Sequence, residues 1–207
     1  MKFLHLAAIM IVSAVSVFAG MRVANLAYIH ATGNIHAVEP GRLYRSATLS
    51  AGRLDRLIEE TGIRTIVNLR GDAGRPWYEA EREVAARRGV DFISFHISAK
   101  HIPDRKTLEE IIFVLRNAPQ PILVHCKSGS DRAGLVSALY QYALAGQSAE
   151  QADRQLSFDY GHFPWLGSRT AAMGEAFSQY VALSPDGEQP PVNGPLTVAS
   201  DEGRRLN

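Results

Sequence analysis

Residues 121–146 read PILVHCKSGSDRAGLVSALYQYALAG. The apolar run at 121–126 predicts a buried strand, a loop of small residues follows, and residues 132–146 have the composition of a helix. Strands and helices alternate in the same way upstream. The predicted strands there include 63–69 and 90–97, and the predicted helices are 51–61, 77–88 and 105–118. This alternation predicts an α/β fold with a central, largely parallel sheet flanked by helices.

Cys126, the single cysteine of the chain, ends the strand, and Arg132 follows six positions later. Backbone N–H groups at a helix start and in a tight glycine-containing loop form an anion-binding site. Gly129, between Ser128 and Ser130, lets the backbone curl closely enough for these groups to converge. Such surroundings favour a thiolate, and a guanidinium can bind two oxygens of one phosphate. The loop therefore predicts a sulfur nucleophile beside a tetrahedral anion.

The loop resembles the signature of the cysteine-dependent protein tyrosine and dual-specificity phosphatases, which is His-Cys, five residues, Arg, and Gly two positions later. His125, Cys126, Gly129, Arg132 and Gly134 stand where that signature needs them. The resemblance extends over residues 35–182. Its segments GRLYRSATL and GIRTIVNLRGD are similar to the opening of compact bacterial members, and an Ile-Pro-Asp turn is similar to one in atypical plant and fungal members.

The resemblance implies that Cys126 attacks phosphorus and that water then hydrolyses the phosphocysteine, with no metal and no other cofactor. His125 is expected to position the loop. The family usually has Ser or Thr after the arginine, where its hydroxyl helps the sulfur to leave. This chain has Ala133, which predicts slow hydrolysis of the phosphocysteine. The expected substrate-binding residues are Lys127, Ser128, Gly129, Ser130, Asp131 and Arg132.

A carboxylic acid must protonate the leaving group, and Asp104 is the first candidate. It lies between a predicted strand and a predicted helix, where the family has its mobile acid loop. It is an equally good N-cap for the helix that follows. Asp131 is the second candidate, since myotubularin-like lipid phosphatases have an aspartate in a similar place, but it could instead contact the loop amides. Asp72 is a third candidate.

Several other residues carry weaker signals. Arg45 and Ser46, at the end of a predicted first strand, could contact the signature loop. Trp77, Trp165 and the segment YGHFPW (160–165) are expected to pack in the core or at its rim.

The first twenty residues hold a nearly unbroken apolar run behind Lys2. This pattern predicts a signal anchor or a cleaved signal peptide, with the amino end in the cytoplasm. The protein is therefore expected in the inner membrane with its catalytic domain in the periplasm, or soluble in the periplasm after cleavage. The expected domains are the signal segment 1–20, a connector 21–34, the catalytic domain 35–182 and a disordered tail 183–207.

The 22 basic and 21 acidic residues give a net charge of +1 and no sign of a nucleic-acid surface. A single cysteine excludes an internal disulfide and a cysteine-rich metal site. The expected substrate is a phosphorylated protein, with phosphotyrosine first and phosphoserine or phosphothreonine also allowed. One alternative is an inositol phosphate or phosphoinositide, which Lys127 favours. Another is a phosphate-binding module without turnover, which Ala133 favours.

Overall fold

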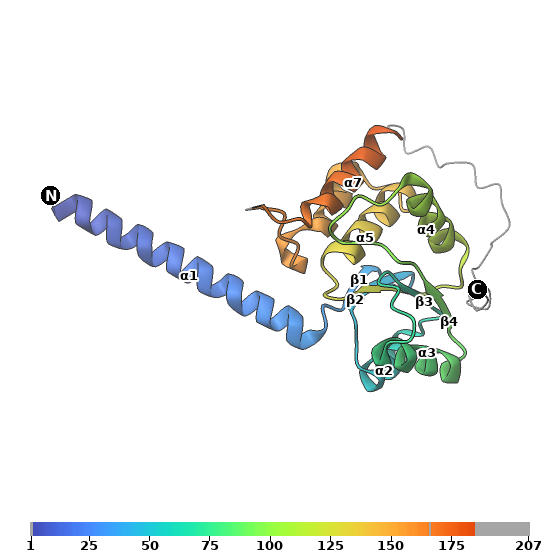
Figure 1. Ribbon diagram of the computed structural model, residues 1–207. Helices are drawn as coiled ribbons and strands as arrows, with labels where there is room; N and C mark the ends of the chain where they lie inside the picture. Colours follow the sequence, from blue (N-terminus) through green and yellow to red (C-terminus); the bar gives the residue numbers. More distant parts are fainter. Residues whose placement is uncertain (1, 166, 185–207) are drawn as a thin grey trace.

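A five-stranded sheet forms the centre of the computed structural model, which describes residues 2–165 and 167–184 (Figure 1). The strand order is β1-β2-β5-β3-β4. β5 pairs in parallel with β2 and β3, β3 pairs in parallel with β4, and β1 is antiparallel to β2. The strands are β1 (His36–Glu39), β2 (Leu43–Ala47), β3 (Thr65–Asn68), β4 (Asp91–Ser94) and β5 (Ile122–Cys126). The predicted α/β fold with a largely parallel sheet is confirmed, while β1 was not predicted.

The strand register brings the functional residues to one edge of the sheet. Ala47 is opposite Cys126, and Asn68 is opposite His125. The carboxyl ends of β2, β3 and β5 therefore meet, which is where ligands bind in open α/β sheets. All five residues of β5 are buried, as its apolar sequence predicts for a central parallel strand.

Helices cover both faces of the sheet (Figure 1). Neighbouring strand residues point to opposite faces of the sheet. On one face, Leu123 of β5 packs against Leu57 and Val84. On the other face, Val124 packs against Ile111 and Val136. The helices on the first face are α2 (Ala51–Thr61) and α3 (Pro76–Arg88). Those on the second face and beyond it are α4 (Arg105–Asn117), α5 (Asp131–Ala143), α6 (Ala149–Asp153), η1 (Arg154–Leu156), η2 (Phe158–Tyr160) and α7 (Ala171–Ala182).

Local signals explain the observed helix ends. α2 and α3 end at Gly62 and Gly89, whose φ angles of 70° and 64° lie in the left-handed region that glycine tolerates. α4 begins after Asp104, whose side chain accepts a hydrogen bond from the backbone N–H of Thr107. The predicted N-cap role of Asp104 is confirmed.

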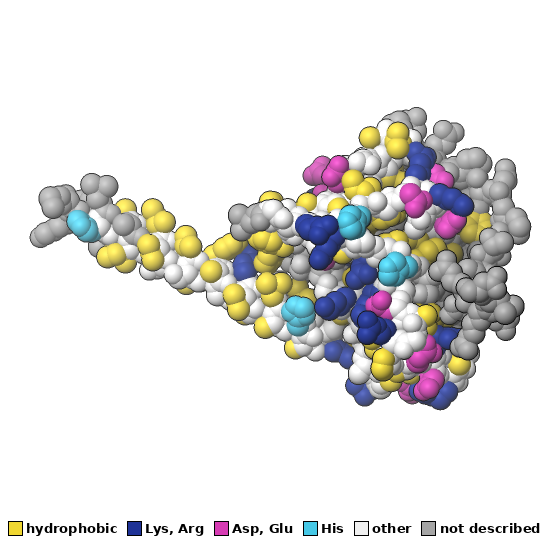
Figure 2. All heavy atoms as spheres, viewed as in Figure 1, with side chains coloured by type: hydrophobic (Ala, Val, Ile, Leu, Met, Phe, Trp, Pro, Cys, Tyr) yellow, Lys and Arg dark blue, Asp and Glu magenta, His cyan; other side chains and the backbone are white. Residues whose placement is uncertain are grey.

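A long helix, α1 (Lys2–Thr32), precedes the domain and extends away from it (Figure 1). It contains the predicted hydrophobic segment and continues through most of the expected connector. Its part from residue 9 to residue 32 is long and apolar enough to cross a membrane, by length and composition alone. Hydrophobic side chains cover much of it (Figure 2). Most of the tail expected to be disordered, residues 185–207, lies outside the described residues.

Candidate active site

The signature loop, residues 126–132, joins the end of β5 to the start of α5. The side chain of Cys126 is buried, with 1% of its surface exposed. The hydroxyl of Thr48 donates a hydrogen bond to the Cys126 carbonyl at 3.2 Å, and the Leu69 amide donates to the His125 carbonyl at 3.0 Å. These bonds tie the base of the loop to the chain that follows β2 and β3.

The loop leaves its own amides free. In the described part of the chain, the backbone N–H groups of residues 127–132 donate to no backbone acceptor. Gly129 has φ 73°, and a Cβ there would lie 2.7 Å from the amide nitrogen of Ala47 and from the carbonyl carbon of Ser46. Only glycine fits such a close approach to β2. The loop therefore has the curled shape and unpaired donors that an anion requires.

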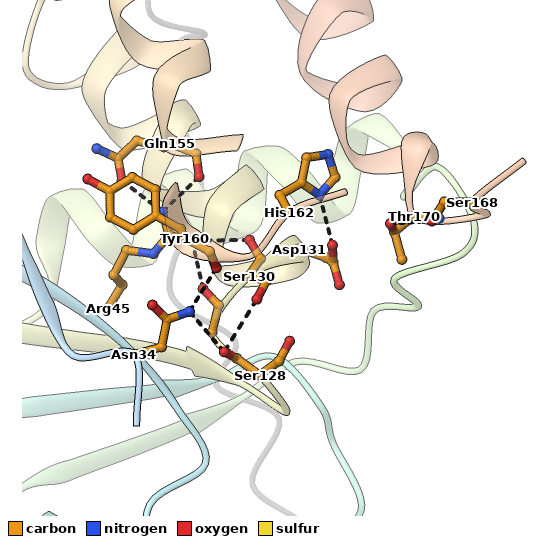
Figure 3. A network of polar contacts seen from close by, with 11 residues as sticks. Asn34, Arg45, Ser128, Ser130, Asp131, Gln155, Tyr160, His162, Ser168 and Thr170 are labelled. Carbon is orange, nitrogen blue, oxygen red and sulfur yellow. Dashed lines mark hydrogen bonds and ion pairs between the residues drawn. The ribbon is translucent and has the colours of Figure 1, made fainter. Parts of the chain in front are cut away.

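Arg45 on β2 donates hydrogen bonds to carbonyl oxygens of the signature loop (Figure 3). Its side chain is fully buried, and Nη2 donates to the carbonyl oxygens of Gly129 at 2.6 Å and Ser130 at 3.1 Å. Nη1 donates to the backbone and side-chain oxygens of Gln155, each at 2.8 Å. The predicted contact of Arg45 with the loop is confirmed. A Cβ on Gly134 would lie 3.2 Å from Nη2, so the second signature glycine makes room for this arginine.

Asn34, just beyond the end of α1, binds the same loop (Figure 3). Its Nδ2 donates to the carbonyl oxygens of Ser128 at 3.0 Å and Tyr160 at 2.9 Å, and its Oδ1 contacts Nε2 of His36 at 2.9 Å. The Tyr160 ring also lies 4.3 Å from the guanidinium of Arg45. Sequence reasoning missed Asn34, because nothing near it in the chain marks a contact 94 residues away.

Asp131 pairs with a histidine that was not expected near it. Its Oδ1 lies 2.8 Å from Nδ1 of His162, which is buried, and about 20% of the Asp131 side chain is exposed (Figure 3). His162 lies outside regular secondary structure, just after η2. The partner of Asp131 is therefore His162, where the sequence suggested the loop amides.

The guanidinium groups of Arg132 and Arg70 lie close to each other beside the signature loop. Nη1 of Arg132 donates to the carbonyl oxygens of Ile97 at 3.2 Å and Leu69 at 3.4 Å, while its buried Nε has no hydrogen-bond partner. Arg70, which the sequence reasoning missed, stacks 3.7 Å from the centre of the Trp77 ring and donates to the Thr48 hydroxyl at 2.7 Å. Burial and the nearby charge of Arg132 lower the pKa of Arg70.

A buried carboxyl lies beneath the loop. Oε2 of Glu81 on α3 is 3.3 Å from Nε2 of His125, and at most 3% of either side chain is exposed. Burial raises the pKa of Glu81 to about 8, against the opposing pull of Arg70. Burial and the charges of Arg70 and Arg132 lower the pKa of His125 to about 3. The interior therefore favours the uncharged form of both groups.

Asp104 uses both carboxyl oxygens as a helix cap. Oδ1 accepts from the Thr107 amide at 2.8 Å and Oδ2 from the Thr107 hydroxyl at 2.9 Å, and these bonds lower the pKa of Asp104. Its side chain is exposed. Asp72 lies 3.6 Å from Arg70. The structure thus brings together the predicted site residues of the signature loop. Of the other two acid candidates, Asp104 caps α4 and Asp72 pairs with Arg70.

Comparisons with known proteins agree with this geometry. A family model described as a DSP-PTPase phosphatase fused to NAD⁺ kinase matches residues 19–173. The dual specificity protein phosphatase TpbA of Pseudomonas aeruginosa is 28% identical over 121 residues, which are 58% of this chain and 51% of that protein. The chain therefore spans about half the length of the curated relatives it matches.

Solved structures show the same fold. The crystal structure of P. aeruginosa TpbA superimposes with a TM-score of 0.58 at 24% identity, covering 74% of this chain and 91% of that one. The complex of PTPMT1 with PI(5)P gives 0.54 at 16% identity and covers 72% and 98% of the two chains. The catalytic domain of the PP-IP phosphatase SIW14 from S. cerevisiae gives 0.54 at 19% identity and covers 73% and 93%. With the family model matching most of its length, the chain belongs to the DSP-PTPase phosphatase family that this model describes.

Proposed function

We propose that this protein hydrolyses phosphomonoesters through a phosphocysteine at Cys126. The observation that carries the proposal is the loop of unpaired amides that begins at Cys126 and ends at Arg132. The loop amides and Arg132 would bind the three equatorial oxygens of the phosphoryl group. The sulfur then forms a bond to phosphorus while the bond to the leaving oxygen breaks, and water later displaces the sulfur and releases inorganic phosphate.

The proton for the leaving oxygen is assigned to Asp104 or Asp131. A well-placed acid contributes a factor of about 100 to 10,000. Asp104 would first have to leave its capping bonds with Thr107, whereas Asp131 already belongs to the loop and contacts His162. Asp104→Asn and Asp131→Asn separate the two, because replacing the true acid removes the basic limb of the pH–rate profile for esters with poor leaving groups and spares good ones.

Phosphotyrosine in a protein is the first proposed substrate. One solved structure of the relative TpbA is a complex with pTyr. We place the domain outside the cytoplasm, held by α1 as a membrane anchor, because the apolar helix precedes it.

An inositol phosphate or phosphoinositide is the second candidate. The specific observation is Arg70, a second guanidinium whose pKa is lowered by burial and by the nearby charge of Arg132, together with the exposed Lys127. Lys, Arg and His side chains also gather on the domain face seen in Figure 2. PTPMT1 was solved with PI(5)P, and SIW14 is named a PP-IP phosphatase.

The test uses the full chain against p-nitrophenyl phosphate, phosphotyrosine peptides and soluble inositol phosphates. Turnover that disappears in Cys126→Ser supports the proposed chemistry, and no turnover by the wild type would overturn it in favour of a phosphate-binding module. Arg70→Gln then separates the substrates. A larger loss of kcat/KM for inositol polyphosphates than for the peptide favours the second candidate, and equal losses favour the first.

A further inference from the structure

An aromatic loop, residues 158–165, stands out on the surface of the domain. Phe158 and Phe163 make an edge contact with ring centres 6.0 Å apart, and Phe163 and Trp165 make another at 5.1 Å. Packing in the core or at its rim was expected for residues 160–165, and the exposed fractions of 40% for Phe163 and 56% for Trp165 place these two rings at the surface. Large apolar side chains grouped at the surface mark a contact with a partner or a membrane.

The aromatic loop lies against α1. Arg22 of α1 is 4.7 Å from the centre of the Phe158 ring and 3.7 Å from Asp159, and it also covers the ring of Phe18 one turn earlier at 4.8 Å. A Cβ on Gly161 would lie 3.7 Å from the side chain of Leu26. In Figure 1 this segment, coloured orange, reaches out from the domain on the side where α1 lies.

The aromatic loop contacts α1 just beyond the end of its apolar segment. Arg22 is the first arginine or lysine after Lys2, and the apolar run between them covers residues 3–19. At 1.5 Å per residue, those seventeen residues span about 26 Å, close to the thickness of the hydrocarbon core. A span of residues 3–19 keeps the charged Arg22 out of the hydrocarbon, which a span of residues 9–32 would not, and it places Arg22 where the hydrocarbon ends. Trp and Tyr are enriched at this level because their rings are apolar and carry a polar group.

We propose that the aromatic loop is a membrane-contacting surface whose Phe163 and Trp165 enter the headgroup region of the bilayer that α1 crosses. The inference rests on α1 being the anchor proposed above, and it does not depend on which phosphate ester is hydrolysed. His162, next to Phe163, contacts Asp131 of the signature loop. Insertion of the aromatic loop would hold the signature loop close to the lipid surface, where it meets phosphoryl groups carried by the membrane or by proteins in it.

The two tryptophans of the chain make the test specific. The full chain is reconstituted in phosphatidylcholine vesicles whose acyl chains are brominated near the headgroup, brominated near the methyl end, or left plain. Trp77→Phe reports on Trp165 alone, and Trp165→Phe reports on Trp77 alone. Resistance to alkaline extraction shows whether α1 is inserted, and hydrolysis of p-nitrophenyl phosphate by the same samples shows whether the catalytic domain is intact.

We expect the emission of Trp165 to be quenched most by bromine near the headgroup and little by aqueous iodide, whereas Trp77 responds little to either lipid. Emission from Trp165 that iodide quenches and bromine does not, in vesicles with inserted α1, would overturn the proposal. Protection from both quenchers would also overturn it, since a protein contact would then cover the loop. Extraction of α1 from the vesicles would refute the anchor and this inference together, while leaving the proposed chemistry to be judged by the hydrolysis assay.

Discussion

Replacing the buried Arg45 should lower kcat by at least about 100-fold while changing stability little, and two opposing free energies explain the small change in stability. Arg45→Met leaves three backbone carbonyl oxygens without their donor, those of Gly129, Ser130 and Gln155. A buried carbonyl oxygen tolerates a missing partner better than an amide does, so each acceptor is taken at the lower end of the usual range, about 1 kcal/mol, and the three together cost about 3 kcal/mol. The opposite term comes from burial, which lowers the pKa of Arg45 from its usual value to about 10. That lowering corresponds to about 3 kcal/mol against the charged form, which the substitution relieves. The free energy of unfolding should therefore change by less than about 2 kcal/mol.

Activity should respond far more strongly. The carbonyls of Gly129 and Ser130 point back to Arg45, so the adjoining amides are free to face the anion. Releasing these carbonyls lets the loop turn donors away from the phosphoryl oxygens. The loss of one such donor lowers kcat by about 100- to 1,000-fold in other enzymes, and a fall of at least about 100-fold is expected here.

The assay compares wild type, Arg45→Met, Arg45→Lys and Arg42→Met as full chains in detergent, by urea unfolding and by kcat on p-nitrophenyl phosphate. Arg42 is an exposed arginine that contacts Glu39 and Gln120, so its loss should cost less than about 1 kcal/mol and leave kcat unchanged. Arg45→Lys keeps the charge without the planar fork and should be intermediate. A stable Arg45→Met protein with the kcat of the wild type would refute the reasoning, and so would one that loses much more than 3 kcal/mol yet keeps its kcat when folded.

Three further predictions concern the same loop. Because the pKa of Glu81 is raised from 4.5 to about 8, its contribution to stability is full below pH 4.5 and is lost as the pH rises through 8. Below pH 6.5 the lowered pKa of the buried His125 gives an opposing slope. The free energy of unfolding of the wild type, measured with urea, should therefore fall between pH 6.5 and 8, by up to about 1.4 kcal/mol per pH unit. Glu81→Gln should remove that slope, and an unchanged slope would show that Glu81 is ionised in the folded protein. Ala133→Ser should speed hydrolysis of the phosphocysteine and shrink the burst of leaving group in rapid mixing; a wild type without a burst, despite a fast first step, would contradict this. Gly129→Ala should abolish vanadate inhibition, because its Cβ would meet β2 at 2.7 Å, whereas Gly41→Ala, with a similar φ of 75° but open space, should retain it.

The sequence predicted those parts of the fold that local patterns determine. Gly62 and Gly89 ended two helices where glycine tolerates a positive φ, and Asp104 began a third as its cap. β1 was missed because it is four residues long and largely half-buried, so it shows no clear alternation. Glu81 could have been found, since it shares a helical face with the buried Tyr78 and Val84 at a spacing of three residues. A charged residue in such a row signals a buried partner.

The parts of the site that the sequence did not predict depend on contacts between distant segments. Asn34 reaches Ser128 across 94 residues, and Arg45 reaches Gln155 across 110. His162 meets Asp131 only because η2 and the chain after it return to the start of α5. No pattern of a few neighbouring residues encodes these pairings, since each depends on how the chain folds between them.

These distant contacts explain how the signature loop keeps its shape before an anion binds. A loop of small residues is flexible by itself, and ordering it on binding would cost about 1–2 kcal/mol for each residue fixed. Here Asn34 and Arg45 bind the carbonyl oxygens of Ser128, Gly129 and Ser130, so three successive peptide groups are oriented from behind. The opposite side of those peptide groups carries the amides that face the anion. Because Asn34 lies two residues beyond the end of α1, the helix that would enter the membrane and the loop that would bind phosphate are joined by a short, hydrogen-bonded segment. Anion affinity should therefore depend on how α1 meets the domain as well as on the loop itself.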